Sequence, residues 1–419
     1  MRRFEFKFKK DQIWNRLAIM LAVVFFLYLG DAVISNFVPS YMQNALGGSL
    51  AMGIMMSFSS IVGFGADLIF PQLFKTVSSR KLILLSISSV LLTAGALLWT
   101  THFVYPAIFL LVMGIWGLYY EFLHFGMASF VANNAAADQR SGVWSIISVV
   151  KSLAYCVGPL LGSWLFLWKG GTPLILLYAG FGFVAYVVWM FVGIKTGGNS
   201  NDKNMEVEHF NMVDEINHWI VLFEHVWPIL IVSLTLGIID AAFWTTGVVM
   251  SDNLSRLHWL GSLFVPAYIL PSIFIGFLVA RLGISKGKKK LAEIFMLLTG
   301  MTMIGFGLTN SVFVLIAISF LIGVLTSVAW PLVDAVYSDI SNRMGREQKH
   351  MMGLSSSTVN MSYITGPVIA GYIAQNIGES KTMMWVGVFV VLVSVVLLLV
   401  TPKKLRLPKK EIETWDRGK

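Results

Sequence analysis

The chain has few charged residues and almost no cysteine. Asp, Glu, Lys and Arg make up 13% of its 419 residues, whereas a soluble globular protein carries about 25%. Hydrophobic residues reach 56% and the mean hydropathy is +0.74, which excludes an ordinary soluble domain and predicts an all-α integral membrane protein. The single cysteine, Cys156, excludes a disulfide framework and is expected to be a small buried hydrophobe.

Several chemical signatures are missing as well. The sequence has no Gly-x-x-x-x-Gly-Lys-Ser/Thr loop for a nucleoside triphosphate, no Cys/His spacing that suits a metal, and no nucleophile with a placed base. The basic N-terminus lacks a short apolar stretch with a small-residue cleavage site, so we expect no cleaved signal peptide. The sequence therefore predicts neither an ATP-driven motor nor an enzyme, and no metal or organic cofactor.

Apolar segments long enough to cross a bilayer, about 20 residues each, make up most of the chain. Six are expected near 17–40, 50–72, 81–101, 105–130, 141–167 and 172–194, and six more near 226–250, 258–280, 291–309, 311–337, 350–376 and 380–401. We therefore predict twelve transmembrane helices in two bundles, residues 1–194 and 226–402, with a cytoplasmic linker at 195–225 and a basic tail at 403–419. Within the linker, residues 210–224 form either a short helix on the membrane surface, with Trp219 on its apolar face, or plain linker.

Positive charge lies almost entirely on one side of these spans. Of the 31 Lys and Arg residues, 27 fall in the termini, the linker and the loops of one side, 3 fall in the alternate loops, and Lys151 lies within a span. The positive-inside rule then places both termini in the cytoplasm, in a cell membrane. The net charge of +9 faces anionic lipid headgroups and requires no nucleic-acid partner.

Two aspartates occupy matching places in the two halves. Asp31 and Asp240 each lie about midway along an apolar span, 209 residues apart. A carboxylate in the hydrocarbon region is costly unless it pairs, takes up a proton or faces water, so it is a candidate functional site by default. The fixed spacing predicts a duplicated membrane unit with an ionisable site in each copy.

A Gly-Pro pair flanked by small residues recurs 208 residues apart, nearly the same spacing. Small residues let helices approach closely in lipid, and a proline inside a span removes a backbone hydrogen bond and bends the helix. The residues are Gly158, Pro159 and Gly162 in one span and Gly366, Pro367 and Gly371 in the other. Two such matches at the repeat spacing strongly favour a pseudo-symmetric fold.

These features together resemble the major facilitator superfamily. The twelve spans, the long central loop and the Gly-Pro spans match its pattern, and the segment from Gly276 to Gly283, which contains Arg281, resembles its signature loop. Ala280 stands where that loop normally has an aspartate. We expect this segment to act as a cytoplasmic gate loop.

The resemblance also implies which spans line a central cavity, namely the first, fourth, seventh and tenth. Each of these carries one acid that would face the cavity: Asp31, Glu121, Asp240 and Asp334. Aromatic residues share the same spans, and would either hold a cation or only pack. They are Trp116, Tyr119, Tyr120, Phe243, Trp244 and Trp330.

Glu121 and Lys151 are expected to be level with one another. Each lies about 15 residues from the turn between the fourth and fifth spans, so each rises by a similar height along its helix. A buried Glu–Lys pair keeps both groups charged at less cost than either alone. The pair would either break and reform during transport or remain a static bridge. His124, on the same face as Glu121, would relay protons or only hydrogen-bond.

The roles of the aspartates remain open in the same way. Asp31 has no basic neighbour on its own span and is the foremost candidate to take up and release a proton; otherwise it pairs with Lys151 or caps a break at Gly30. Asp240 is a candidate for the same role. Asp334, near the cytoplasmic end of its span, is expected to contact the basic gate loops, or else to be a midplane site.

The acids and the resemblance predict a proton-coupled secondary transporter that works by alternating access, with a proton gradient as its energy source. We expect a monomer in the lipid bilayer that exports a cationic or amphipathic small molecule. The segment from Met113 to Tyr120 lacks the arginine usual in such antiporters. The alternatives are uptake of a sugar or amino acid by symport, and a non-transporting receptor or scaffold that has kept the fold.

Overall fold

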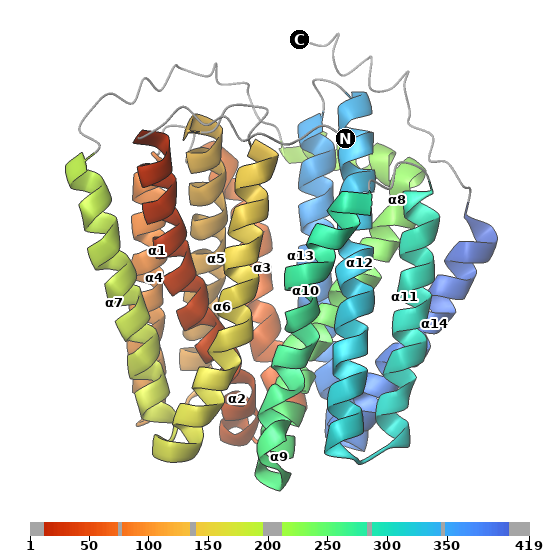
Figure 1. The fold of residues 1–419 in the computed structure, drawn as a ribbon. Helices are drawn as coiled ribbons and strands as arrows, with labels where there is room; N and C mark the ends of the chain where they lie inside the picture. The colour runs from red at the N-terminus through yellow and green to blue at the C-terminus, as the bar shows by residue number, and fades with distance from the viewer. Residues whose placement is uncertain are drawn as a thin grey trace.

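In the computed structural model the chain is built from long helices that run side by side (Figure 1). The structure describes residues 12–73, 78–134, 140–195, 212–282, 287–344 and 348–401, and no strand occurs in these ranges. Ten of the helices described are long and apolar enough to cross a membrane. With α10 and α13 they make twelve helices of 17 residues or more, so the predicted all-α membrane fold is confirmed.

The first bundle holds the helices up to the linker, which pack on one another as α1 with α6 and α7, and α5 with α3 and α4. Its elements are α1 (Gln12–Ser35), α2 (Val38–Leu46), α3 (Ser49–Leu73), α4 (Ser79–Thr100), α5 (Pro106–Asn134), α6 (Arg140–Lys169) and α7 (Gly171–Lys195). The short α2 ends at Gly47, whose left-handed φ of 77° lets the chain reverse into α3.

The second bundle repeats this plan, with α8 packed on α13, and α11 on α12 and α14. Its elements are α8 (Met212–Ala242), the π-helical turn η1 (Phe243–Gly247), α9 (Val248–Leu257), η2 (Trp259–Leu263), α10 (Phe264–Leu282), α11 (Lys288–Ile304), η3 (Gly305–Leu308), α12 (Val312–Met344), α13 (Gln348–Ile377) and α14 (Glu379–Val400). The predicted spans agree with these bounds to within about seven residues, except at the start of α8.

The prediction of a separate short surface helix at the end of the linker is wrong. Residues 212–224 are the first turns of α8, a continuous helix of 31 residues, so the predicted start of the second bundle at residue 226 falls inside a helix. Trp219 is held there by α13, because a Cβ added to Gly353 would lie 3.2 Å from the Trp219 ring. The rest of the predicted linker, residues 196–211, and the tail from 402 onward lie outside the described residues.

The Gly-Pro spans place each bundle's aspartate against a close helix contact. A Cβ on Gly158 of α6 would lie 2.4 Å from the Cβ of Ala32, the residue after Asp31. A Cβ on Gly366 of α13 would lie 2.8 Å from the Cβ of Ala241, the residue after Asp240. Only glycine permits these approaches, so the repeat read from the sequence appears as the same contact in both bundles.

The two bundles meet along α3 with α13, along α6 with α10, and where α2 touches α9. Figure 1 shows α2 and α9 together at the end of the molecule opposite the first turn of α1. At this end, which we call the far end, α3 and α13 are nearly in backbone contact. A Cβ on Gly53 would lie 2.1 Å from the carbonyl oxygen of Pro367, and one on Gly371 would lie 2.3 Å from that of Ser49.

Side-chain hydrogen bonds reinforce the far end. Gln43 Nε2 donates to Glu379 Oε1 at 3.2 Å, and the backbone N–H of Leu50 donates to Gln375 Oε1 at 3.3 Å. Both bonds join the first bundle to the second. The far end is therefore sealed by close backbone packing and by polar contacts together.

Replacing Lys289 with methionine is expected to destabilise the second bundle. Lys289 Nζ pairs with Glu293 Oε1 at 2.9 Å, and the two side chains are only 8% and 3% exposed. Breaking a buried ion pair from one side typically costs about 3–5 kcal/mol, because the other charge stays buried. Thermal unfolding in detergent would measure the fall in Tm. Arg256→Met is the matched control, because the Arg256–Asp252 pair is exposed on the arginine side and such pairs contribute about 0–1 kcal/mol; equal Tm shifts would contradict the prediction.

Candidate functional site

Asp31 is completely buried and is surrounded by aromatic donors. It lies on α1, and its Oδ1 accepts a hydrogen bond of 2.6 Å from Trp116 Nε1 of α5. The Tyr120 hydroxyl, one turn further along α5, donates to Oδ2 at 2.9 Å, and the Tyr155 hydroxyl of α6 also donates to Oδ2. Three donors that converge on one carboxylate compensate the loss of its water.

Asp240 has a smaller shell of the same kind. Its Oδ2 accepts a hydrogen bond of 3.0 Å from Trp330 Nε1 of α12, and its Oδ1 accepts one from the Tyr268 hydroxyl of α10. Tyr268 is held in place by Phe243, whose ring stacks on it at 4.0 Å with the planes 7° apart. Each bundle thus contributes one aspartate that is held by an indole N–H and a phenol.

Lys151 lies close enough to both aspartates to interact with each of them. Its ammonium is 5.5 Å from the centre of the Tyr28 ring and 5.8 Å from that of Tyr155, and it interacts electrostatically with both Asp31 and Asp240. The side chain is nevertheless exposed. A side chain that reaches acids of both bundles and still contacts solvent must border the space between the bundles.

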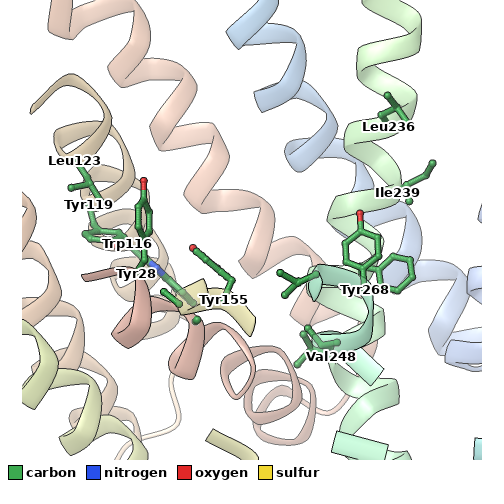
Figure 2. Packing of buried hydrophobic residues seen from close by; sticks show 14 of the residues in the cluster. Tyr28, Trp116, Tyr119, Leu123, Tyr155, Leu236, Ile239, Val248 and Tyr268 are labelled. Atoms are coloured by element: carbon green, nitrogen blue, oxygen red, sulfur yellow. The ribbon is translucent and has the colours of Figure 1, made fainter. Parts of the chain in front are cut away.

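The Asp31 shell reaches the second bundle where Tyr155 contacts Trp244. The edge of one ring faces the other at 5.2 Å between centroids, with Tyr155 on α6 and Trp244 in the π-helical turn η1. Figure 2 shows Tyr28, Trp116 and Tyr155 gathered on the side of the first bundle and Tyr268 on the side of the second. A π-helical turn within a long helix frequently marks a functional site, and this one begins three residues after Asp240.

The predicted Glu121–Lys151 pair is wrong. No ion pair joins these residues, both of which lie in the described part of the chain, and Glu121 instead interacts with Asp67 on α3. Glu121 turns toward α3 because Gly63 leaves room for it; a Cβ at Gly63 would lie 3.0 Å from Glu121 Oε1. Equal height on neighbouring helices did not place the two side chains on facing sides.

The remaining predicted residues fall into two groups. His124 is exposed on α5 and interacts electrostatically with Asp67 and Lys151, so it lies beside the central group. Asp334 is exposed on α12, and no ion pair reaches it from the described residues; Lys288, from the start of α11, pairs with Asp339 at 2.6 Å instead. In the gate loop, Gly276 and Arg281 belong to the last turns of α10, and Gly283 lies outside the described residues.

Tyr155, Tyr268 and Asp67 are site residues that the sequence did not predict. Tyr155 is part of the Gly-Pro segment, whose pattern indicates only a bend. Tyr268 and Asp67 lie on α10 and α3, outside the four spans that the resemblance turns toward the cavity. The sequence does carry a signal for Asp67, because a carboxyl group at the end of an apolar stretch needs a polar partner inside the protein.

Comparison with known proteins agrees with this architecture. The family model described as Major Facilitator Superfamily matches residues 2–158 and 242–417. The chain belongs to the Major Facilitator Superfamily. The family points to a membrane transporter rather than an enzyme, and makes the chain a secondary transporter. A search of curated proteins found no match.

Solved structures of other superfamily members share the fold. A POT family transporter in complex with a thioalcohol-conjugated peptide has a TM-score of 0.72 and 12% identity, and the match covers 93% of this chain and 96% of that one. The same values hold for a POT family transporter in complex with 5-aminolevulinic acid. The human organic anion transporter MFSD10 (TETRAN) has a TM-score of 0.66 and 15% identity, with 93% and 100% covered. At these identities the likeness concerns the fold alone.

Proposed function

We propose that the chain is a proton-coupled exchanger that moves a cationic or amphipathic small molecule across a cell membrane, as a monomer with its termini in the cytoplasm. The observation that carries the proposal is the position of Lys151, which interacts with an aspartate of each bundle. A charge that can shift between acids on two moving bundles links their movement to ion binding.

The charges of this group favour exchange. With Asp31 and Asp240 ionised and Lys151 protonated, the three residues carry a net charge of −1. One proton or one monovalent cation neutralises that charge, whereas both together would leave an uncompensated positive charge in a low-dielectric site. The two ions therefore compete, which is the requirement for antiport. The rings of Tyr155 and Trp244 meet edge to face at 5.2 Å between centroids, and such aromatic faces are suited to bind an organic cation between the bundles.

The arrangement of contacts supports alternating access. The far end is sealed by the Gly53 and Gly371 contacts. The exposed side chains of Tyr120, His124 and Lys151 lie from the centre toward the end where α1 begins. With the termini in the cytoplasm, as the Lys and Arg distribution predicts, this conformation opens inward. Rocking of the two bundles would open the other side.

A second candidate function is transport of an organic anion. Lys151 is exposed while Asp31 is fully buried, so the charge most accessible to a ligand is positive. One structural neighbour is named as an organic anion transporter. In this case the anion would bind Lys151, and a proton on one of the aspartates would travel in the same direction.

Transport by the purified full-length protein in liposomes with a trapped pH-sensitive dye distinguishes these functions. An outward gradient of tetraphenylphosphonium, a lipophilic cation, is expected to drive proton uptake into the liposomes. An aromatic sulfonate is expected to move no protons if the exchanger proposal holds. Proton movement with the sulfonate alone would replace it by anion symport, and no movement with either probe would contradict both.

A further inference from the structure

We infer that the far end of the molecule holds a second binding site, separate from the Asp31–Lys151–Asp240 group, for a small primary ammonium compound. The site is a cavity of about 90 Å³ between the first bundle and α9. One water needs about 10–15 Å³ of such space, so the cavity has room for about six waters or for a ligand with a similar number of heavy atoms. The inference does not depend on the exchanger proposal.

Both bundles form the walls of this cavity. The first bundle contributes the junction of α1 with α2 and the last turns of α6, and the second contributes Asp252 and Ser255 of α9. Asn44 is exposed and Asp252 is partly exposed, so the polar mouth of the cavity opens at the far end. Asn36 of the wall lies five residues beyond the fully buried Asp31, about 7 Å further along the helix. A ligand in the cavity is therefore distinct from one at the central group.

Two buried polar atoms of the cavity wall have no hydrogen-bond partner among the described residues. They are Asn36 Oδ1 and the hydroxyl of Ser40, a residue that is only 8% exposed. The Asn36 amide is held by its Nδ2, which donates to Ser163 Oγ at 3.2 Å, so Oδ1 is left as an acceptor. Buried polar groups are nearly always paired in native proteins. Two unpaired ones in one cavity indicate a bound group that donates hydrogen bonds.

The second bundle brings a negative charge to the same cavity. Asp252 lines it, and its Oδ2 pairs with Arg256 Nη2 at 3.1 Å on the same helix. The Arg256 side chain is 60% exposed, and an exposed pair of this kind contributes little, so the carboxylate stays available to a ligand. The Ser255 hydroxyl already donates to the carbonyl oxygen of Ser251 at 2.7 Å and can only accept from a ligand. These groups favour a cation over an anion.

Aromatic rings line the cavity beside these acceptors. The Phe37 ring stacks on that of Tyr41 at 5.1 Å between centroids with the planes 14° apart, and it lies 5.7 Å from the Phe166 ring. Gly171 leaves Phe37 its place, because a Cβ there would lie 2.7 Å from Phe37 Cζ. A primary ammonium group supplies three N–H donors for the acceptors, and its alkyl chain would pack on the rings, which also attract a cation. The ligand class is therefore a small alkylammonium ion.

Calorimetric titration of the purified full-length protein in detergent with n-pentylammonium tests the inference, and pentanoate serves as an anion of similar size. We expect saturable binding of the ammonium ion and none of pentanoate. Ser40→Ala and Asp252→Asn, one in each bundle, should each weaken binding by about tenfold or more, because each removes an acceptor or a charge from the ammonium group. Ser40→Ala removes only an unpaired hydroxyl, so it should fold like the wild type.

Asp339→Asn is the matched control, because Asp339 is an exposed, ion-paired acid at the opposite end of the molecule; it should bind pentylammonium like the wild type. Weaker binding in both Ser40→Ala and Asp252→Asn supports the site, and unchanged binding in either overturns it. Equal binding of pentanoate, or no binding of either ion, also overturns it and leaves a cavity that holds water only. Binding that Asp240→Asn abolishes and both variants retain would place the ligand at the central group instead. None of these outcomes depends on whether tetraphenylphosphonium drives proton uptake.

Discussion

Replacing Lys151 with methionine is expected to reduce cation-driven proton flux in liposomes by about a hundredfold or more. Without the ammonium, Asp31 and Asp240 would leave a net charge of −2 between the bundles, where Lys151 now interacts with both. Leaving a buried charge unpaired costs about 3–5 kcal/mol, and each 1.4 kcal/mol is about tenfold in an equilibrium. The site would hold a proton and a cation together, so exchange between them would be lost even though both still bind.

The same reasoning predicts a rescue. The double variant Lys151→Met with Asp240→Asn restores the net charge of −1 and is expected to recover a measurable part of the exchange. Lys381→Met, at an exposed position on α14, is the matched control and should transport like the wild type. If the double variant is no more active than Lys151→Met alone, the charge balance is not the basis of coupling and Lys151 has another role.

Replacing Gly53 with leucine is expected to hold the far end of the molecule open. Even a Cβ at this position would lie 2.1 Å from the Pro367 carbonyl oxygen, which is backbone and cannot turn away. Overpacking of this kind costs about 1–3 kcal/mol or more, and α3 can avoid it only by moving off α13. The population of the conformation sealed at the far end would fall by about fivefold at the lower cost and by about a hundredfold at the higher cost.

Spin labels at the exposed Asn44 of α2 and Lys381 of α14, in a chain with Cys156 replaced by serine, would measure this opening. We expect a longer distance in Gly53→Leu, together with loss of transport. Gly65→Leu is the matched control on the same helix, since no atom lies within 4 Å of a Cβ added there, and it should keep the wild-type distance. An unchanged distance in Gly53→Leu would show that the far end yields without separating the bundles.

The outcome for Glu121 shows what spacing along the chain can predict. Counting from the turn placed Glu121 and Lys151 at the same height, but height says nothing about the direction of a side chain around the helix axis. The structure turns Glu121 into the gap left by Gly63 and turns Lys151 toward Tyr28 and Tyr155. Rotation of α5 is set by its packing on α3 and α4, and that packing depends on segments far away in the sequence.

Composition and spacing along the chain are enough to predict the membrane class, the long helices, the repeat and the two aspartates near the middle of their spans. These are properties of local composition and of spacing, because the bilayer forces each apolar segment into a helix with its backbone bonds satisfied. Which side chains meet depends instead on how the helices pack: Trp116, Tyr120 and Tyr155 at Asp31, Trp330 and Tyr268 at Asp240, and Asp67 near Glu121. These partners come from different helices, and a buried charge is stabilised by whichever donors the packing of those helices brings to it.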